Sequence, residues 1–287
     1  MKKRKGIILA GGSGTRLLPL TTSLSKQILP VFDKPMIYYP LSTLMQSMIK
    51  DILIITTEKD QSLFTNLLKD GSHLGINITY EIQDEPRGIS EAFIIGKDFI
   101  DNDYVTLILG DNIFYGGNLE DEIKISLSRL NVASIFGCEV KDPERYGVIN
   151  FDGNKILNIE EKPINPKSNM AVSGLYFYDD NVCEYVKDLK PSSRGELEIT
   201  DLNKIYLRSS KLELRKLKQV SWFDAGTHSS LIEVSQNIAS YQKRKGRKIG
   251  CIEQIAFDNN FINEEDLHKL SSEYNNEYGD YLREILD

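Results

Sequence analysis

The sequence has few of the residues that build disulfide frameworks or histidine metal centres. Its 287 residues include three cysteines, three histidines and one tryptophan. The cysteines are far apart and form no C-x-x-C pair, and the histidines are scattered, so neither type is spaced as a zinc site. We therefore expect reduced thiols, a cytoplasmic location and no histidine- or cysteine-bound metal.

Long apolar runs and an excess of positive charge are also missing. No run approaches the roughly 18 apolar residues that a membrane-spanning helix requires, and the basic residues 2–5 lead within a few positions into a glycine-rich turn. The formal net charge is −7 at pH 7, whereas proteins that bind nucleic acids present a basic surface. We expect neither a membrane nor a nucleic acid as partner. Because the net charge is negative, any anionic substrate must be bound by positively charged or N–H groups gathered at its site.

Apolar runs rich in β-branched residues alternate with amphipathic stretches through the first half of the chain. This alternation is typical of a mostly parallel sheet covered by helices. Strands are predicted at 6–9, 52–56, 78–82, 104–109 and 133–139, and helices near 35–49, 60–69, 90–98 and 119–130. The expected fold is α/β, Rossmann-like and doubly wound, with a mixed, mostly parallel sheet and ligands at the carboxyl ends of the strands.

The second half of the chain has a different pattern. Residues 147–159 read as an inserted β-hairpin, because alternating runs flank an Asp152-Gly153 turn. Strands are predicted at 173–178 and 210–219, a helix at 198–208, and a mainly helical, charged region from His228 onward. Inserted strands of this kind usually form one wall of a substrate site.

A glycine-rich segment, Leu9-Ala10-Gly11-Gly12-Ser13-Gly14-Thr15-Arg16, follows the first predicted strand. Glycines let the backbone turn sharply and bring N–H groups against an anion, and Arg16 adds a positive charge. The Walker pattern fails because Gly14 is followed by Thr15-Arg16, and the dinucleotide fingerprint fails at Leu17. Taken alone, the segment is equally compatible with a plain structural turn. We interpret it as a phosphate cradle.

Lys26 lies about one loop length further on, in Lys26-Gln27-Ile28-Leu29-Pro30, before a predicted helix that begins with a proline. Together with the cradle and the segment 33–41, this arrangement resembles the signature of the sugar-1-phosphate nucleotidylyltransferases. The chain is most similar to the branch that acts on glucose 1-phosphate with dTTP, and the resemblance covers nearly its whole length. It implies transfer of a thymidylyl group from dTTP to α-D-glucose 1-phosphate, giving dTDP-glucose and pyrophosphate, the first step toward dTDP-deoxysugars such as dTDP-rhamnose.

Two alternatives stay open. One is a nucleotidylyltransferase that uses UTP, CTP or another hexose 1-phosphate, because the methyl group separating thymine from uracil is worth only about 1 kcal/mol. The other is a non-catalytic sugar-nucleotide sensor. The joint presence of Arg16, Lys26, Asp111, Lys162 and Asp224 counts against a sensor, which has no need of a metal pair.

Two aspartates are the candidate metal ligands. Asp111 follows an apolar strand and a glycine, and Asp224 precedes a turn of small residues. A single aspartate in such a place is more often a helix cap or turn residue. Two carboxylates without histidine or cysteine suit Mg²⁺, and the resemblance implies that this pair holds it.

The resemblance also implies the roles of the remaining site residues. Arg16, Lys26 and Lys162 are the expected catalytic residues. The expected nucleotide-binding residues are Leu9, Gly11, Gly12, Gly14, Thr15, Arg16, Gln27, Gln83, Gly88 and Asp111. The expected sugar-phosphate-binding residues are Asn112, Tyr146, Gly147, Glu161, Lys162, Val172 and Arg194.

The chemistry of these side chains fits the roles. Gln83 can pair its donor and acceptor with a pyrimidine imide, and Gly88 permits close approach of the backbone. Glu161 can accept hydrogen bonds from sugar hydroxyls, and the Lys162 ammonium can hold a phosphate. At position 91 the chain has glutamate where relatives commonly have glutamine.

The resemblance further implies the domain organisation and assembly. Residues 1–240 form the expected catalytic domain, with a nucleotide-binding half to about residue 130 and a sugar-binding half at about 131–227. Residues 241–287 form a helical region for oligomer and regulatory contacts. A homotetramer inhibited by dTDP-rhamnose at a separate site is expected, although Gly117 and Asn118 stand where relatives commonly have histidine and aspartate.

Overall fold

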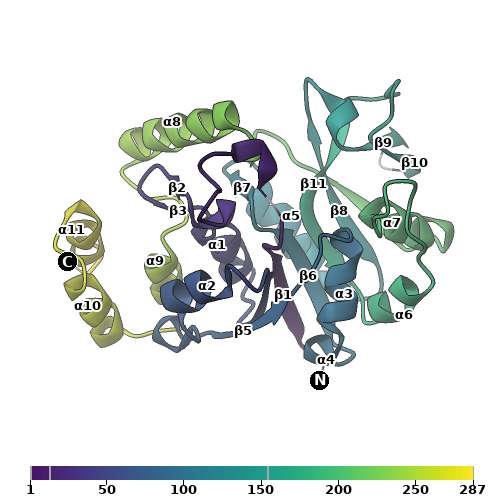
Figure 1. The fold of residues 1–287 in the computed structure, drawn as a ribbon. Coiled ribbons are helices and arrows are strands. Elements are labelled where there is room, and N and C mark those ends of the chain that lie inside the picture. Colours follow the sequence, from purple (N-terminus) through teal and green to yellow (C-terminus); the bar gives the residue numbers. More distant parts are fainter. Residues whose placement is uncertain (1, 13, 154, 287) are drawn as a thin grey trace.

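The computed structural model describes residues 2–12, 14–153 and 155–286. A central sheet runs through it in the order β10-β9-β11-β6-β1-β4-β5, with β8 and β12 joined beside β11 (Figure 1). Strands β1 (Arg4–Leu9), β4 (Asp51–Thr56), β5 (Asn77–Ile82) and β6 (Tyr104–Leu109) are parallel. Their carboxyl ends therefore share one edge, and the predicted α/β fold class is confirmed.

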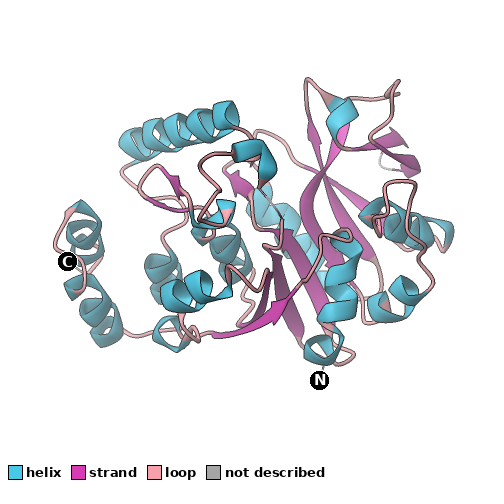
Figure 2. Ribbon diagram, viewed as in Figure 1, coloured by secondary structure: helices cyan, strands magenta, loops and turns pink. Residues whose placement is uncertain are grey.

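Helices cover both faces of this sheet (Figure 2). Successive side chains of a strand point to opposite faces, and Ile7 and Ile8 of β1 accordingly belong to two separate cores. Helices α1 (Tyr38–Gln46) and α2 (Gln61–Leu68) pack on the Ile8 face. Helices α3 (Ala92–Ile95), α4 (Lys97–Ile100), α6 (Val182–Lys187) and α7 (Ile199–Arg208) pack on the Ile7 face. Strand β1, between β4 and β6, lies where the winding reverses, which is the ligand-binding place of such sheets.

The second half extends the sheet with antiparallel strands. The predicted hairpin is confirmed as β9 (Gly147–Asp152) and β10 (Lys155–Glu161). Strand β11 (Met170–Tyr178) is buried at every residue. It pairs with β6 on one side and β8 (Ala133–Glu139) on the other, and its side chains enter the cores on both faces of the sheet. Strand β12 (Leu212–Lys216) runs parallel to β8 at the edge.

The chain ends in helices α8 (His228–Lys245), α9 (Ile252–Asp258), α10 (Glu264–Ser272) and α11 (Glu277–Glu284). The last three share the core of α1, to which they contribute apolar residues such as Ile252, Leu267 and Leu282. The proposed boundary at residue 240 falls within α8. Among the described residues, no helix combines the length and the apolar character that a bilayer crossing requires.

Several short elements lie between these. They are the 3-10 turns η1 (Thr15–Leu17), η2 (Lys26–Ile28), η3 (Ser72–Leu74), η4 (Ile89–Glu91) and η5 (Pro143–Arg145), the pair β2 (Pro30–Val31) and β3 (Lys34–Pro35), and helix α5 (Leu119–Ser128). Strands β7 (Asn112–Tyr115) and β13 (Ser221–Asp224) form a separate antiparallel pair. The sequence patterns did not reveal either of these two strands.

Two helix predictions need correction. The helix predicted from Pro35 begins at Tyr38, because Lys34 and Pro35 pair with β2 instead. The helix predicted at 90–98 is broken into η4, α3 and α4, with the break between α3 and α4 at Gly96. A Cβ at Gly96 would lie 3.0 Å from the Leu53 side chain, so the glycine allows α3 and α4 to pack closely on the sheet.

Candidate active site

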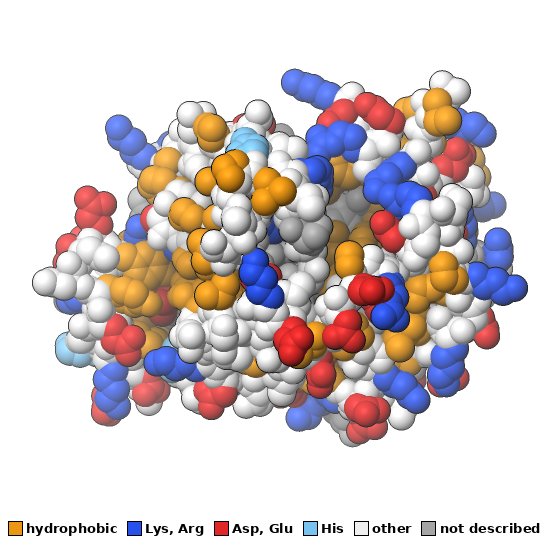
Figure 3. All heavy atoms as spheres, viewed as in Figure 1, with side chains coloured by type: hydrophobic (Ala, Val, Ile, Leu, Met, Phe, Trp, Pro, Cys, Tyr) orange, Lys and Arg blue, Asp and Glu red, His pale blue; other side chains and the backbone are white. Residues whose placement is uncertain are grey.

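Two adjoining cavities open at the carboxyl ends of β1 and β6, where the surface is hollowed and Lys and Arg side chains gather nearby (Figure 3). The loop-side cavity, of about 310 Å³, lies against the glycine-rich loop and is lined by Gly12, Lys26 and Gln83 among others. The hairpin-side cavity, of about 580 Å³, lies against β9 and β10. Both linings include Arg16 and Asp111, so the two cavities meet at these residues.

The glycine-rich loop needs glycine at some positions and not at others. Gly14 has a φ of +62° at the start of η1, a conformation that favours glycine. Gly11 is buried, and a Cβ there would lie 2.5 Å from Gln83 Oε1. At Gly12 the nearest atom to such a Cβ is 3.7 Å away, which is ordinary contact. Ser13 lies outside the described residues.

Lys26 of η2 forms an ion pair with Asp111, and both side chains are about nine-tenths buried. Asp111 follows β6 through Gly110, at the edge where the parallel strands end. Burial raises the pKa of Asp111, but the charge and hydrogen bond of Lys26, together with a hydrogen bond from Asn112, hold that pKa below its usual range. Asp111 is therefore a carboxylate at neutral pH.

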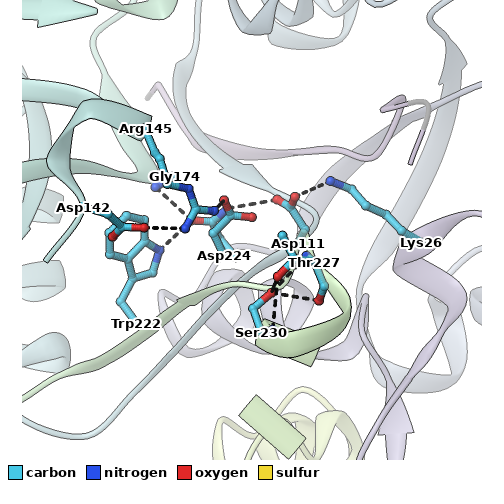
Figure 4. A network of polar contacts seen from close by, with 10 residues as sticks. Lys26, Asp111, Asp142, Arg145, Gly174, Trp222, Asp224, Thr227 and Ser230 are labelled. Atoms are coloured by element: carbon cyan, nitrogen blue, oxygen red, sulfur yellow. Dashed lines mark hydrogen bonds and ion pairs between the residues drawn. The ribbon is translucent and has the colours of Figure 1, made fainter. Parts of the chain in front are cut away.

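Asp224 reaches the same place through the pairing of β13 with β7. In that pair Asp224 is opposite Asn112, and the Ala225 N–H donates to the Asp111 carbonyl at 3.1 Å. Burial, and next the negative charge of Asp111, raise the pKa of Asp224 above its ordinary value. In Figure 4, Lys26 approaches Asp111 from one side and Arg145 approaches Asp224, at 3.7 Å, from the other.

The carboxylate pair fits a divalent cation. Its donors are hard oxygens, and two mutually repelling carboxylates at one site are stabilised by a cation between them. Within the described part of the chain, no three His, Cys, Asp or Glu side chains gather as a metal site. A Mg²⁺ ion held by Asp111 and Asp224 would therefore take its other ligands from water and substrate phosphate, as is common for this ion.

Asn112 braces this pair. Its Oδ1 accepts hydrogen bonds from Trp222 Nε1 at 2.6 Å and from the Gly174 N–H at 3.1 Å, and its Nδ2 donates to Asp111 Oδ1 at 3.0 Å. A Cβ at Gly174 would lie 2.6 Å from the Asn112 amide, so glycine is needed there for packing. Asn112 thus positions Asp111 besides lining the hairpin-side cavity.

The hairpin-side cavity is lined by all seven predicted sugar-phosphate residues: Asn112, Tyr146, Gly147, Glu161, Lys162, Val172 and Arg194. Glu161 Oε2 accepts a hydrogen bond from Thr200 Oγ1 at 2.5 Å. Arg194 lies 2.8 Å from Glu198 and 3.5 Å from Glu161. Lys162 has a φ of +43°, a strained backbone for a lysine, and its N–H donates to the Tyr146 carbonyl at 3.0 Å.

The predicted nucleotide-binding residues are only partly brought together. The loop-side lining includes Leu9, Gly12, Arg16, Gln27, Gln83, Gly88 and Asp111. Gly11 lies beneath Gln83, whereas Gly14 contacts Thr21 and Thr15 is exposed, so these three shape the loop without lining the cavity. Gly88, with a φ of +108°, packs so closely on Leu197 that a Cβ would lie 2.5 Å from its backbone.

Several lining residues are not among those predicted from the sequence. Arg145, Thr200 and Trp222 line the hairpin-side cavity together with Glu196 and Glu198. Arg145 precedes Tyr146 directly and Trp222 lies two positions before Asp224, so their nearness in the chain to predicted site residues is a signal for both. Thr200 had none, because it enters the site only through the packing of α7 on β10.

The chain is similar to known proteins over nearly its whole length. The nucleotidyl transferase family model matches residues 5–241. Glucose-1-phosphate thymidylyltransferase of Neisseria meningitidis serogroup A is 50% identical over 285 residues, covering 98% of this chain and 99% of that one. The enzyme of that name from Xanthomonas campestris pv. campestris is 52% identical over 98% of this chain and 97% of its own length.

Two solved structures have a similar fold. A Bacillus anthracis protein provisionally described as a glucose-1-phosphate thymidylyltransferase, in complex with a sucrose, is 43% identical with a TM-score of 0.77 and covers 82% of this chain and 95% of that one. A UDP-glucose pyrophosphorylase complexed with UDP-glucose is 26% identical with a TM-score of 0.73, over 85% of this chain and all of that one. The resemblance inferred from the sequence is thereby confirmed, and the chain belongs to the nucleotidyl transferase family, among relatives that are glucose-1-phosphate thymidylyltransferases.

Proposed function

We propose that the chain transfers a thymidylyl group from dTTP to α-D-glucose 1-phosphate, giving dTDP-glucose and pyrophosphate. The observation that carries this proposal is the largely buried pair Asp111 and Asp224, placed where two cavities of different lining meet. Relatives about half identical over nearly the whole chain support the same substrates. The product would enter the synthesis of dTDP-deoxysugars such as dTDP-rhamnose.

In this proposal dTTP binds in the loop-side cavity. The N–H groups of the glycine-rich loop bind its phosphates, and Gln83 and Gly88 recognise the base. Arg16 is exposed and lines the loop-side cavity, and Lys26 already pairs there with the Asp111 carboxylate, so both can neutralise the leaving pyrophosphate. Leu9, Gly11, Gly14, Thr15 and Gln27 complete and shape this side.

Glucose 1-phosphate binds in the hairpin-side cavity. Lys162 and Arg194 hold its phosphate, and Glu161 accepts hydrogen bonds from its hydroxyls. Arg194 is engaged by Glu198 at 2.8 Å, which keeps the guanidinium at the cavity wall. Asn112, Tyr146, Gly147 and Val172 form the remaining surface.

The reaction needs alignment and charge neutralisation more than proton transfer. The attacking phosphate is already an anion, so no side chain has to remove its proton. Mg²⁺ held by Asp111 and Asp224 would supply positive charge at the α-phosphate during in-line attack. Each well-placed charge contact contributes about 3 kcal/mol to transition-state stabilisation, so losing one lowers the rate about a hundredfold.

Pyrophosphate release from the purified chain with Mg²⁺ tests the proposal. We compare dTTP, UTP, CTP and ATP with glucose 1-phosphate, and then other hexose 1-phosphates with the preferred nucleotide. Release with dTTP and glucose 1-phosphate that disappears in Asp111→Ala is the expected result. Preference for another pair supports the first alternative, and binding of dTDP-sugars without release by any pair supports the sensor.

We also propose that the chain acts in the cytoplasm as a homotetramer, as the resemblance implies. Two large apolar side chains support self-association: Ile232 on α8 is 59% exposed and Phe32 is 48% exposed. They belong to one region, because the Phe32 N–H donates to Ser235 Oγ of α8 at 3.2 Å. Light scattering gives the oligomeric state, and Ile232→Glu is expected to weaken it.

Feedback inhibition by dTDP-rhamnose at a separate site is proposed for a further cavity of about 490 Å³ between α5, α8 and α9. Tyr115, Gly117 and Lys248 are among its lining residues. A Cβ at Gly117 would lie 2.2 Å from the Lys218 carbonyl, so this chain needs glycine where relatives commonly have histidine. We expect dTDP-rhamnose to inhibit the wild type and to inhibit Lys248→Ala more weakly. Without dTDP-rhamnose, the two should have the same activity.

A further inference from the structure

Glu91 contacts the side chain that faces the nucleotide base in the proposed complex. Gln83 Nε2 donates a hydrogen bond to Glu91 Oε2 at 2.7 Å. Gln83 is 4% exposed and lines the loop-side cavity, whereas Glu91 does not line it. Any effect of Glu91 on a bound base therefore passes through Gln83.

The contact fixes which end of the Gln83 amide faces which neighbour. A carboxylate has only acceptor oxygens, so it requires the NH₂ end of an amide and rejects the oxygen end. The Gln83 oxygen is accordingly turned the other way, toward Gly11, where a Cβ would lie 2.5 Å from it. A glutamine at position 91 would offer a donor as well as an acceptor and would accept either orientation of Gln83.

The Glu91 side chain is itself held in place. It is 14% exposed on the short turn η4, and Arg87 Nη1 lies 3.9 Å from its other oxygen, Oε1. A hydrogen bond joins this turn to the segment before α7, since the Ser90 N–H donates to the Leu197 carbonyl at 3.1 Å. Gly88, just before the turn, packs on the same Leu197 backbone.

We infer that Glu91 is a positioning residue for base selection: by accepting from Nε2 it fixes which end of the cavity-lining Gln83 amide is the acceptor, and so favours bases with an N–H at position 3 over bases with a lone pair there. Thymine and uracil carry that N–H, and cytosine carries the lone pair. A fixed acceptor matches the first two and repels the third. The inference rests on the proposed nucleotide-binding role of the loop-side cavity.

The test is the affinity of wild type and Glu91→Gln for dTTP, dUTP and dCTP, measured by calorimetry without any sugar phosphate. We expect the dTTP-to-dCTP affinity ratio to fall about tenfold in the variant. The dTTP-to-dUTP ratio is expected to stay within about twofold, because both bases carry the same N–H. Glu85→Gln is the matched control, since Glu85 lies on the same loop with a 73% exposed side chain.

The outcomes separate this inference from the proposed function. An unchanged dTTP-to-dCTP ratio overturns it, as does a parallel loss for all three nucleotides, which is the signature of a merely structural role. Thermal unfolding of Glu91→Gln checks that the variant folds, and Glu91→Ala, which also frees the amide, serves as a second variant with the same expected ratios. Because the readout is nucleotide binding, a failure of the glucose 1-phosphate reaction leaves this result interpretable.

Discussion

The two adjoining cavities are built in different ways. Most residues that line the loop-side cavity come from two short stretches of chain, residues 9–27 and 83–89. The hairpin-side cavity takes side chains from β7, β9, β10, β11, α7 and β13. A phosphate cradle can be local because neighbouring N–H groups converge within one turn, whereas a surface of many side chains has to be assembled from distant segments.

The two cavities also differ in what keeps them in shape. On the loop side, absent Cβ atoms create the space, as at Gly11 beneath Gln83. On the hairpin side, polar side chains hold one another, as Thr200 and Arg194 hold Glu161. An added methyl group should therefore harm the first, and a lost hydroxyl should harm the second.

The largest effect is expected where the cavities meet. Asp224→Asn removes a charge from the carboxylate pair with little change of shape, so kcat should fall about a hundredfold or more, as measured by pyrophosphate release. Asp142→Asn is the control, because Asp142 also pairs with Arg145, at 2.6 Å, but is 43% exposed. That variant should stay within about threefold of wild type. Equal losses in both variants would show that Arg145, not the carboxylate pair, carries the effect.

The loop side alone should respond to Gly11→Ala. The added methyl group meets Gln83 Oε1 at 2.5 Å, and overpacking of about 1–3 kcal/mol should weaken dTTP binding about tenfold or more. Gly12→Ala, whose methyl group has 3.7 Å of room, should bind dTTP almost as wild type does. Calorimetry measures both, and similar affinities for the two variants would contradict this account of the loop.

The hairpin side alone should respond to Thr200→Val. Thr200 is 1% exposed, and loss of its hydroxyl leaves Glu161 Oε2 without this donor, at a cost of about 1 kcal/mol or more. We expect KM for glucose 1-phosphate to rise about fivefold while dTTP affinity is unchanged. Thr200→Ser should restore KM, and a change in dTTP affinity instead would mean that the cavities are not independent.

The smallest effect is expected from Trp222→Phe, which tests whether the hairpin side supports the shared carboxylate. The variant keeps an aromatic ring but loses the 2.6 Å hydrogen bond to Asn112, while the Gly174 N–H still donates to the same oxygen. We expect a loss of about 1 kcal/mol in unfolding free energy, which lowers Tm by about 2–4 °C. Calorimetric unfolding measures the change in Tm. An unchanged Tm would show that the Trp222 hydrogen bond does not help to hold Asn112.

The sequence predictions are accurate where local patterns decide the structure and fail where distant segments must pair. Strands β6 and β8 were predicted to the residue, because their apolar, β-branched runs are long and end at turn residues. Strands β7 and β13 were missed because they pair only with each other and are short. The sequence around Pro35 allows a helix start, but Pro35 pairs with Pro30 of β2, so the helix begins only at Tyr38.

The sequence by itself determined the α/β alternation, the hairpin around Asp152-Gly153 and the glycine-rich loop with Arg16, since each depends on interactions between residues near in the chain. Only the tertiary structure decided that Asp224 lies beside Asp111, that Thr200 donates to Glu161, and that Gln83 donates to Glu91. The first of these depends on the register of β13 against β7, and the others on how η4 and α7 pack. These contacts depend on how whole elements pack, so no local pattern of residues predicts them.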